Sequence, residues 1–301
     1  MNDSLIVSVI AAEGVTRIAD VVRKITRDFK SSGTVGTPIW LSPDRACDIP
    51  VSFASPELIE ILPHGFVHAG EGVDVNVLSP ANRRKKLLVA DMDSTIIGCE
   101  CLDELADMAH LKPQIAAITE QAMNGEIAFE PALRERVTLL KGLALTALER
   151  TYKERVKLNP GAKALVATMK KHGARTCLVS GGFTYFTQRV AKDAGFDDNQ
   201  ANTLLDDGSR LTGEVKEPIL GREAKLSALK AEIDKLKIAP EESLAVGDGA
   251  NDLSMIQYAG LGVAYRAKPI VAEAAGAAIK YGDLRALLYL QGYSDADIVE
   301  G

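Results

Sequence analysis

The chain has 301 residues, of which 47% are hydrophobic and 25% are charged, and its formal net charge is −6. This acidic balance argues against general nucleic-acid binding, which needs a basic surface, and no apolar run approaches the ~20 residues that cross a bilayer. We therefore expect a globular protein with neither a nucleic-acid nor a membrane partner.

The first residues and the cysteines bear on the cell compartment. Asp3 stands where a signal peptide needs positive charge, and no small-residue cleavage pattern follows it. The four cysteines lack metal-type spacing, because Cys99 and Cys101 are separated by a single residue. We expect reduced thiols and a cytoplasmic protein.

Residues 1–80 predict a separate α+β domain. Apolar, β-branched runs predict strands, and apolar residues at helical spacing predict helices, in the order β-α-β-β-α-β. The predicted strands cover 4–11, 37–41, 48–54 and 73–78, and the predicted helices cover 14–29 and 56–62. The order resembles a ferredoxin-type, ACT-like module. Modules of that kind often bind amino acids at interfaces, so regulatory binding of L-serine, a homodimer and plain packing all stay open.

A short linker is predicted between two domains. Residues 81–86, ANRRKK, contain four consecutive basic residues, and a basic run this short is usually solvated. The second domain is then predicted to cover 87–301.

The stretch LLVADMDST at 87–95 organises the second domain. Four apolar residues run directly into Asp91, and Asp93 follows one residue later. The run is too short for a buried helix and suits a buried parallel strand. Because ligands of open α/β sheets sit outside the carboxyl ends of the strands, these carboxylates are candidate site residues. A solvated turn is the alternative, since Asp and Ser are ordinary turn residues.

Two further apolar runs end in polar residues. The run at 176–179 leads to Ser180 and two glycines, and the run at 243–246 leads to the letters GDGAND. Lys225 lies between them on a predicted helix. The alternation of strands and helices predicts a Rossmann-like, doubly wound parallel sheet.

The ordered set DxDST, SGG, Lys and GDGxxD resembles the motifs of the haloacid-dehalogenase (HAD) superfamily of phosphotransferases. Glu100 and the letters EQAMNGEIAFEPALRERVTLLKG at 120–142 resemble the phosphoserine phosphatase family within it. The resemblance covers about 87–301. It implies a helical cap at about 97–158 and a small β-flap around Asp207 and Gly208. Such a cap would cover the site, exclude water and contact the substrate.

The resemblance also assigns the catalytic carboxylates. Asp91 would be the nucleophile that forms an aspartyl-phosphate, and Asp93 would be the general acid and then the general base. Two carboxylates in different environments can divide these roles. Mg²⁺ prefers oxygen ligands and would be held by Asp91, the Asp93 backbone carbonyl and Asp248, with Asp252 bound directly or through water. A glycine-rich turn is the alternative for GDGAND.

Four residues would bind the phosphate. The Ser180 hydroxyl and the Gly181 N–H would donate to phosphate oxygens, Lys225 would neutralise charge, and Asn251 would orient the site. An ordinary surface lysine is the alternative for Lys225.

The cap would read the amino acid. The resemblance matches Glu100 to the ammonium group of phosphoserine and Arg136 to its carboxylate, which a planar fork can bind through two oxygens. Met123 and Phe129 would form an apolar wall. For Glu100 and Arg136, a solvated helix face is the alternative.

The function implied is Mg²⁺-dependent hydrolysis of O-phospho-L-serine to L-serine and phosphate, the last step of L-serine biosynthesis. L-serine could also act as a product inhibitor. Alternatives are a HAD phosphatase or phosphotransferase for another small ester, for example transfer to homoserine, and an amino-acid-sensing protein with a decayed catalytic half. The intact motifs argue against the last of these.

Overall fold

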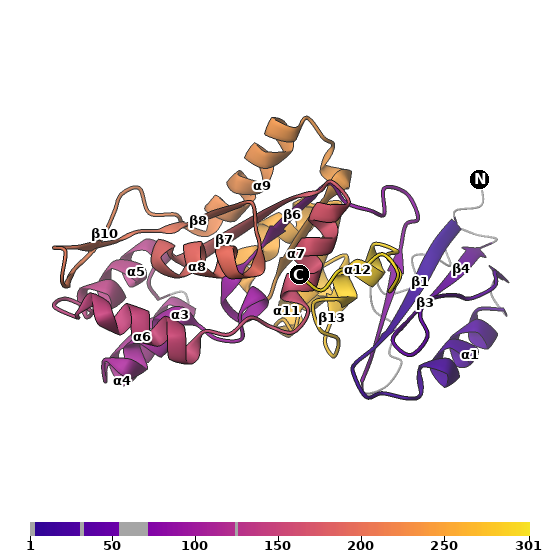
Figure 1. The fold of residues 1–301 in the computed structure, drawn as a ribbon, viewed down its shortest axis with the longest axis horizontal. Coiled ribbons are helices and arrows are strands. Elements are labelled where there is room, and N and C mark those ends of the chain that lie inside the picture. Colours follow the sequence, from indigo (N-terminus) through magenta and orange to yellow (C-terminus); the bar gives the residue numbers. More distant parts are fainter. Residues whose placement is uncertain (1–3, 31–32, 54–71, 124–125) are drawn as a thin grey trace.

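The computed structural model describes residues 4–30, 33–53, 72–123 and 126–301 (Figure 1). These residues form an antiparallel sheet near the N-terminus, a six-stranded sheet and a two-stranded hairpin. The helix predicted at 56–62 lies outside the described residues. None of the described helices combines the length and the apolar character needed to cross a membrane.

The N-terminal sheet is antiparallel, as a ferredoxin-like domain requires. Its strands run in the order β2-β4-β1-β5, and β3 also pairs with β4. The apolar stripe of α1 (Ile18–Phe29) packs on one face of this sheet. The strands are β1 (Ser4–Ala11), β2 (Gly33–Val35), β3 (Ile39–Ser42), β4 (Ala46–Phe53) and β5 (Val73–Leu78).

One strand prediction in this part was wrong in detail. The strand expected at 37–41 is β3, which begins after Pro38, and the short strand β2 before Pro38 was not predicted. Proline has no N–H to donate to a sheet ladder, so the chain leaves the ladder there and pairs again after it.

The predicted doubly wound parallel sheet is confirmed. Its strand order is β13-β12-β11-β6-β7-β8, and every neighbouring pair is parallel. The chain runs from β6 outward to β8 and then restarts at β11 on the other side of β6. This reversal makes a switch point between β6 and β11, where ligands of such sheets bind. The strands are β6 (Leu87–Ala90), β7 (Arg175–Phe183), β8 (Asp198–Asn202), β11 (Ser243–Gly247), β12 (Leu261–Tyr265) and β13 (Ala277–Ile279).

Helices cover both faces of this sheet, because successive side chains of a strand point to opposite faces. Leu88 and Ala90 face a cluster that includes α7 (Ala162–Lys171), α8 (Thr184–Ala194) and α12 (Ala286–Leu290). Leu87 and Val89 face a second cluster. It contains α9 (Arg222–Leu236), α10 (Leu253–Tyr258) and α11 (Pro269–Ala274).

A helical cap follows β6, as expected, and lies at one end of the molecule together with the flap (Figure 1). The hairpin of β9 (Leu204–Asp206) and β10 (Leu211–Val215) is bonded to it, since Gly142 N donates to Leu211 O at 2.8 Å and Leu211 N donates to Leu143 O at 2.9 Å. Cap and flap are therefore hydrogen-bonded to each other. The cap helices are α3 (Cys101–Met108), α4 (Lys112–Met123), α5 (Phe129–Thr138) and α6 (Leu145–Arg155).

Candidate active site

The predicted polar residues meet at the carboxyl end of the parallel sheet. Asp91 directly follows β6, and its N–H donates to Val246 O on the neighbouring strand at 3.0 Å. Asp248 follows β11, and Ser180 lies near the end of β7. Because β6 lies between β7 and β11, residues nearly 160 positions apart come together.

Lys225 joins two of the carboxylates. Its Nζ lies 2.7 Å from Asp91 Oδ1 and 2.5 Å from Asp252 Oδ1, and all three side chains are buried. Burial lowers the pKa of Lys225, but the attraction of Asp91 and Asp252 outweighs it and raises this pKa above its ordinary value. The alternative of a solvated surface lysine is therefore wrong.

The carboxylates form a compact acidic cluster. One oxygen of each of Asp91, Asp248 and Asp252 lies within 4.8 Å of the others. Burial and then repulsion from Asp252 raise the pKa of Asp91, and the same causes raise the pKa of Asp248 to about 6. A single lysine does not balance these three carboxylates, of which Asp91 and Asp252 are buried, so the donor set fits a divalent metal with oxygen ligands.

Asp93 is held from two sides. Its Oδ1 accepts from Cys101 N at 2.9 Å, at the start of α3, and its Oδ2 accepts from the Ser180 hydroxyl at 3.0 Å. Burial raises the pKa of Asp93 despite these bonds. The turn Met92–Ile96 brings it there, and Ser94 in that turn takes the left-handed φ of 55°. Asp93 and Asp91 thus have different partners, as an acid and a nucleophile require.

The two charged cap residues expected to contact an amino acid lie near each other, and Glu100 also lies near Asp93 and Asp248. Glu100 accepts from the Ser94 hydroxyl at 2.6 Å, and burial, followed by repulsion from Asp93, raises its pKa to about 7. The Arg136 side chain is half-buried, and the effect of burial outweighs the charges of Asp103 and Glu100, so its pKa lies below the usual value. Glu100 as a whole residue is nevertheless exposed, at the position just before α3, so the solvated alternative stays open for it.

Phe129, Asn251 and Met123 are the remaining residues expected at the site. The Phe129 ring lies 3.4 Å from where a Cβ on Gly181 would be, so the cap lies against the end of β7 that carries Ser180 and Gly181. Asn251 lies in the turn Ala250–Asp252. Met123 ends α4, but its side chain is outside the described part of the chain.

Sequence reasoning missed two supporting residues. Thr95 donates to Asp248 Oδ1 at 3.2 Å, and it was already visible as the last letter of DxDST. Asn202 is buried and bonds three backbone groups, donating to Gly181 O and Leu220 O and accepting from Leu220 N. It follows a polar strand, so no local pattern pointed to it.

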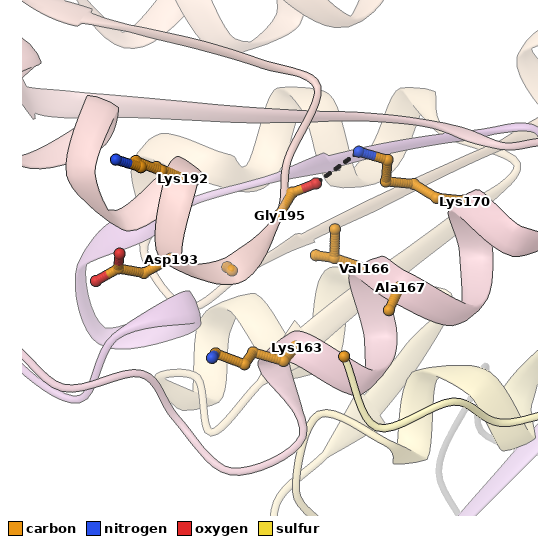
Figure 2. A pocket seen from close by; sticks show the side chains of 9 residues that line it. Lys163, Val166, Ala167, Lys170, Lys192, Asp193 and Gly195 are labelled. Carbon is orange, nitrogen blue, oxygen red and sulfur yellow. Dashed lines mark hydrogen bonds between the residues drawn. The ribbon is translucent and has the colours of Figure 1, made fainter.

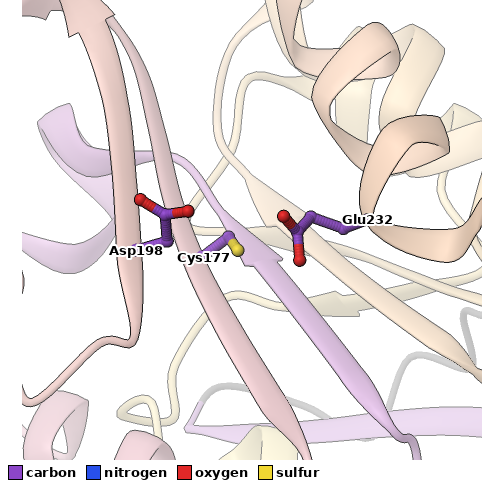
Figure 3. A group of neighbouring side chains, drawn as sticks. All are labelled: Cys177, Asp198 and Glu232. Carbon is purple, nitrogen blue, oxygen red and sulfur yellow. The ribbon is translucent and has the colours of Figure 1, made fainter. Parts of the chain in front are cut away.

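A second acidic cluster lies elsewhere in the parallel sheet, formed by Cys177, Asp198 and Glu232 (Figure 3). The Arg175 guanidinium donates to Asp198 at 3.1 Å and forms an ion pair with Glu232. Because Arg175 and Asp198 are the first residues of β7 and β8, this cluster sits at the amino end of the sheet. Arg175 therefore already supplies the positive charge that a metal would bring to these carboxylates.

A groove of about 290 Å³ lies between α7 and α8 (Figure 2). Lys163, Lys170 and Lys192 line it, and Lys170 donates to Gly195 O at 2.8 Å. None of the expected site residues lines this groove.

A parallel α/β sheet with paired aspartates after its central strand and a cap over them defines a class of hydrolases. Residues 88–257 match the haloacid dehalogenase-like hydrolases, and the chain belongs to that family. A curated relative is the phosphoserine phosphatase of Polaromonas sp. (strain JS666 / ATCC BAA-500). It is 46% identical over 226 residues, which cover 73% of this chain and 96% of that protein. The phosphoserine phosphatase of Archaeoglobus fulgidus is 44% identical over 216 residues, which cover 71% of this chain and 62% of that protein.

Two solved structures are also similar. A HAD family hydrolase from Salmonella enterica subsp. enterica serovar Typhi has a TM-score of 0.83 at 29% identity, and the match covers 97% of this chain and 99% of that one. A substrate-bound phosphoserine phosphatase complex has a TM-score of 0.63 at 38% identity, with 68% and 97% covered. The first likeness extends to the N-terminal part of the chain.

Proposed function

We propose that the chain is a Mg²⁺-dependent phosphatase that hydrolyses O-phospho-L-serine to L-serine and phosphate, the last step of L-serine biosynthesis. One observation carries the proposal. A buried lysine holds the candidate nucleophile Asp91, at 2.7 Å, within an acidic cluster, and Glu100 lies between this cluster and Arg136 in its electrostatic contacts. The names of relatives at 44–46% identity support the choice of substrate.

Asp91 acts as the nucleophile. Its carboxylate oxygen forms a bond to phosphorus while the bond from phosphorus to the serine oxygen breaks, which leaves an aspartyl-phosphate. Water then attacks the same phosphorus and frees Asp91 and inorganic phosphate. Lys225 favours the ionised form of Asp91 that this attack requires.

Asp93 moves the protons. Its protonated carboxyl gives its proton to the departing serine oxygen. The resulting carboxylate takes a proton from the attacking water in the second step. The Cys101 N–H fixes its orientation for both transfers, and the Ser180 hydroxyl holds it before substrate binds.

Asp91, Asp248 and the Asp93 backbone carbonyl would hold Mg²⁺, with Asp252 contributing directly or through water. When bound, Mg²⁺ neutralises the charge that the phosphate and the carboxylates bring together. Since Lys225 already bonds one oxygen of Asp252, this carboxylate has only its second oxygen free for the metal or its water, and Gly249 N donates to that oxygen at 3.0 Å.

Ser180, Gly181, Lys225 and Asn251 bind or orient the phosphate. In the structure the Ser180 hydroxyl donates to Asp93, so its bond has to turn towards a phosphate oxygen when substrate binds. Gly182 N donates to the Ser180 oxygen at 2.9 Å and helps to hold this oxygen in place.

Glu100 and Arg136 read the amino acid. A glutamate pairs with the ammonium group, and the arginine fork pairs with the carboxylate. Phe129, with Met123, provides the apolar wall between them. This pairing distinguishes phosphoserine from esters that lack one of the two charges.

The deciding experiment measures Mg²⁺-dependent phosphate release from phosphoserine, phosphothreonine and p-nitrophenyl phosphate, with Asp91→Asn as the inactive control. We expect phosphoserine to have the highest kcat/KM. A preference for another ester would favour a different HAD phosphatase, and phosphate transfer to homoserine without release would favour a phosphotransferase.

We also propose the division of the chain into residues 1–80, a linker at 81–86 and a catalytic domain at 87–301 with its cap at about 97–158. The separate sheets on either side of the linker support this division. The same assay, with L-serine added, measures whether L-serine inhibits phosphate release as a product or changes it as a ligand of the N-terminal part.

A further inference from the structure

Two buried polar side chains of β5 bond the N-terminal sheet to the catalytic domain. Asn76 accepts from Ala278 N at 2.8 Å and donates to Ala278 O at 3.1 Å. Asp74 accepts from Lys280 N at 2.9 Å and Gly282 N at 2.8 Å, and also from Tyr281 N. Asp74 and Asn76 are 3% and 0% exposed. Since β13 is an edge strand, Asn76 bonds backbone groups that a neighbouring strand would otherwise bond, and Asp74 bonds the three residues that follow β13.

The segment held by Asp74 is bonded in turn to the loop after β12. Arg266 N donates to Ile279 O at 2.7 Å, and its guanidinium donates to Gly282 O at 3.4 Å. Arg266 has a left-handed φ of 47°, which a residue with a side chain adopts only when its surroundings hold it there.

The same loop reaches the acidic cluster. Lys268 N, two residues beyond Arg266, donates to the backbone carbonyl of Asp248 at 3.3 Å. Hydrogen bonds and the short backbone segments between them therefore link the Asp74 carboxylate, through segment 280–282 and loop 266–268, to a candidate metal ligand.

Apolar packing also holds the N-terminal sheet against the catalytic domain. Ile10, Leu41 and Leu78 of the N-terminal part belong to the same buried cluster as Leu287 and Leu288 of α12. The N-terminal sheet thus forms part of the wall of the catalytic domain, and segment 280–282 lies between the two.

We propose that Asp74 is a positioning residue for the metal site: by holding segment 280–282 it fixes loop 266–268 and, through Lys268, the orientation of Asp248. The inference rests on the proposed function, in which Asp248 is a Mg²⁺ ligand. It makes the N-terminal part a contributor to metal affinity, although every residue assigned to the chemistry lies beyond residue 86.

The test compares Asp74→Ala with Asp48→Ala in the full chain. Asp48 is the matched control, because it is equally buried and also crosses to the catalytic domain through Arg83, but Arg83 bonds Tyr289 O and Leu290 O rather than loop 266–268. Two quantities are measured for each protein: the rise of Tm with MgCl₂ concentration in the absence of substrate, and the MgCl₂ concentration for half-maximal phosphoserine hydrolysis. Asp74→Asn, which keeps one acceptor oxygen, is the second variant.

We expect Asp74→Ala to require about threefold to thirtyfold more MgCl₂ in both measurements, the range that changes along a coupling network produce. Asp74→Asn should lie between it and the native chain, and Asp48→Ala should lower Tm without changing the MgCl₂ requirement. Equal MgCl₂ requirements for Asp74→Ala, Asp74→Asn and the native chain would overturn the positioning role, as would an equal increase in Asp48→Ala. A native chain that neither gains Tm from MgCl₂ nor hydrolyses phosphoserine would overturn the proposed function, and the inference with it.

Discussion

Two acidic clusters occupy opposite ends of the same parallel sheet. Asp91, Asp248 and Asp252 lie at the carboxyl ends of the strands, and Cys177, Asp198 and Glu232 lie at the amino end (Figure 3). Spacing alone does not separate them, because both sets bring possible ligand atoms within 4.8 Å of one another.

The difference lies in the partners of the carboxylates. At the amino end, Arg175 bonds both Asp198 and Glu232, so the charge is largely balanced within the protein. Burial raises the pKa of Glu232, but the bonds from Arg175 and Lys235 outweigh it and leave this pKa below its usual value. At the carboxyl end, Lys225 leaves the pKa values of Asp91 and Asp248 raised. Unbalanced buried charge, rather than a cluster of acids, marks the site.

The largest expected effect contrasts one carboxylate from each cluster. Asp91→Asn should lower kcat for phosphoserine by about a thousandfold or more, because the nucleophile is lost. Glu232→Gln should leave kcat within about twofold, since it removes a distant ion pair. Phosphate release by purified, folded variants checks both. Comparable losses in the two variants would remove the functional distinction between the clusters.

The second prediction separates the two aspartates of the DxD pair. Asp93→Asn should lower kcat/KM for phosphoserine by about 10²- to 10⁴-fold, the usual contribution of a general acid. The loss should be much smaller for p-nitrophenyl phosphate, because nitrophenolate leaves without a proton. Equal losses on both substrates would show that Asp93 supports the site without protonating the leaving group.

The third prediction concerns the residues that read the ligand beside the first cluster. Arg136→Ala should lower kcat/KM for phosphoserine by a factor that corresponds to about 2–5 kcal/mol, the cost of losing one partner of a desolvated charge pair. In the same variant, kcat/KM for phosphoethanolamine, which has no carboxylate, should fall little. Glu100→Gln should lower kcat/KM for phosphoserine but leave kcat/KM for phosphoglycolate, which has no ammonium group, almost unchanged. Uniform losses across the three esters would mean that these side chains only support the cap.

The fourth prediction breaks the charge balance of the second cluster. Arg175→Met should leave Glu232 buried without its arginine and lower the free energy of unfolding by about 1–3 kcal/mol, less than for a fully buried pair because Arg175 is partly exposed. Activity per folded molecule should not change. Thermal and urea unfolding measure the loss, and the double variant Arg175→Met with Glu232→Gln should recover part of it.

The smallest expected effect is a difference in pH dependence. Asp91 and Asp248 have raised pKa values in the folded chain, so they reduce its stability as pH rises from about 4 through the pKa of Asp248 of about 6. Bound Mg²⁺ should remove this cost, so the Tm gained from MgCl₂ should be larger at pH 8 than at pH 5. Glu232 has a lowered pKa, so its stabilisation is present above about pH 4.5 and is lost as pH falls. A Tm gain from MgCl₂ that does not depend on pH would contradict the first assignment.

The sequence by itself determined the features that depend on neighbouring residues. Short apolar runs followed by Asp91, Ser180 and Asp248 predicted buried parallel strands with polar residues at one edge, and the alternation with helices predicted the sheet. Parallel strands carry their carboxyl ends at the same edge, so the meeting of these residues followed from the pattern.

Only the tertiary structure decided which distant groups are bonded. The polar strand β8 escaped prediction because an edge strand lacks a continuous apolar run. The ion pairs of Lys225 with Asp252 and of Arg175 with Glu232 escaped it too, as did the bonds of Asp74 to segment 280–282. Local periodicity records which face of an element is buried. It does not record which charged side chain lies on the facing element. The charge of that side chain decides whether a buried carboxylate is paired within the fold or needs a metal to balance it.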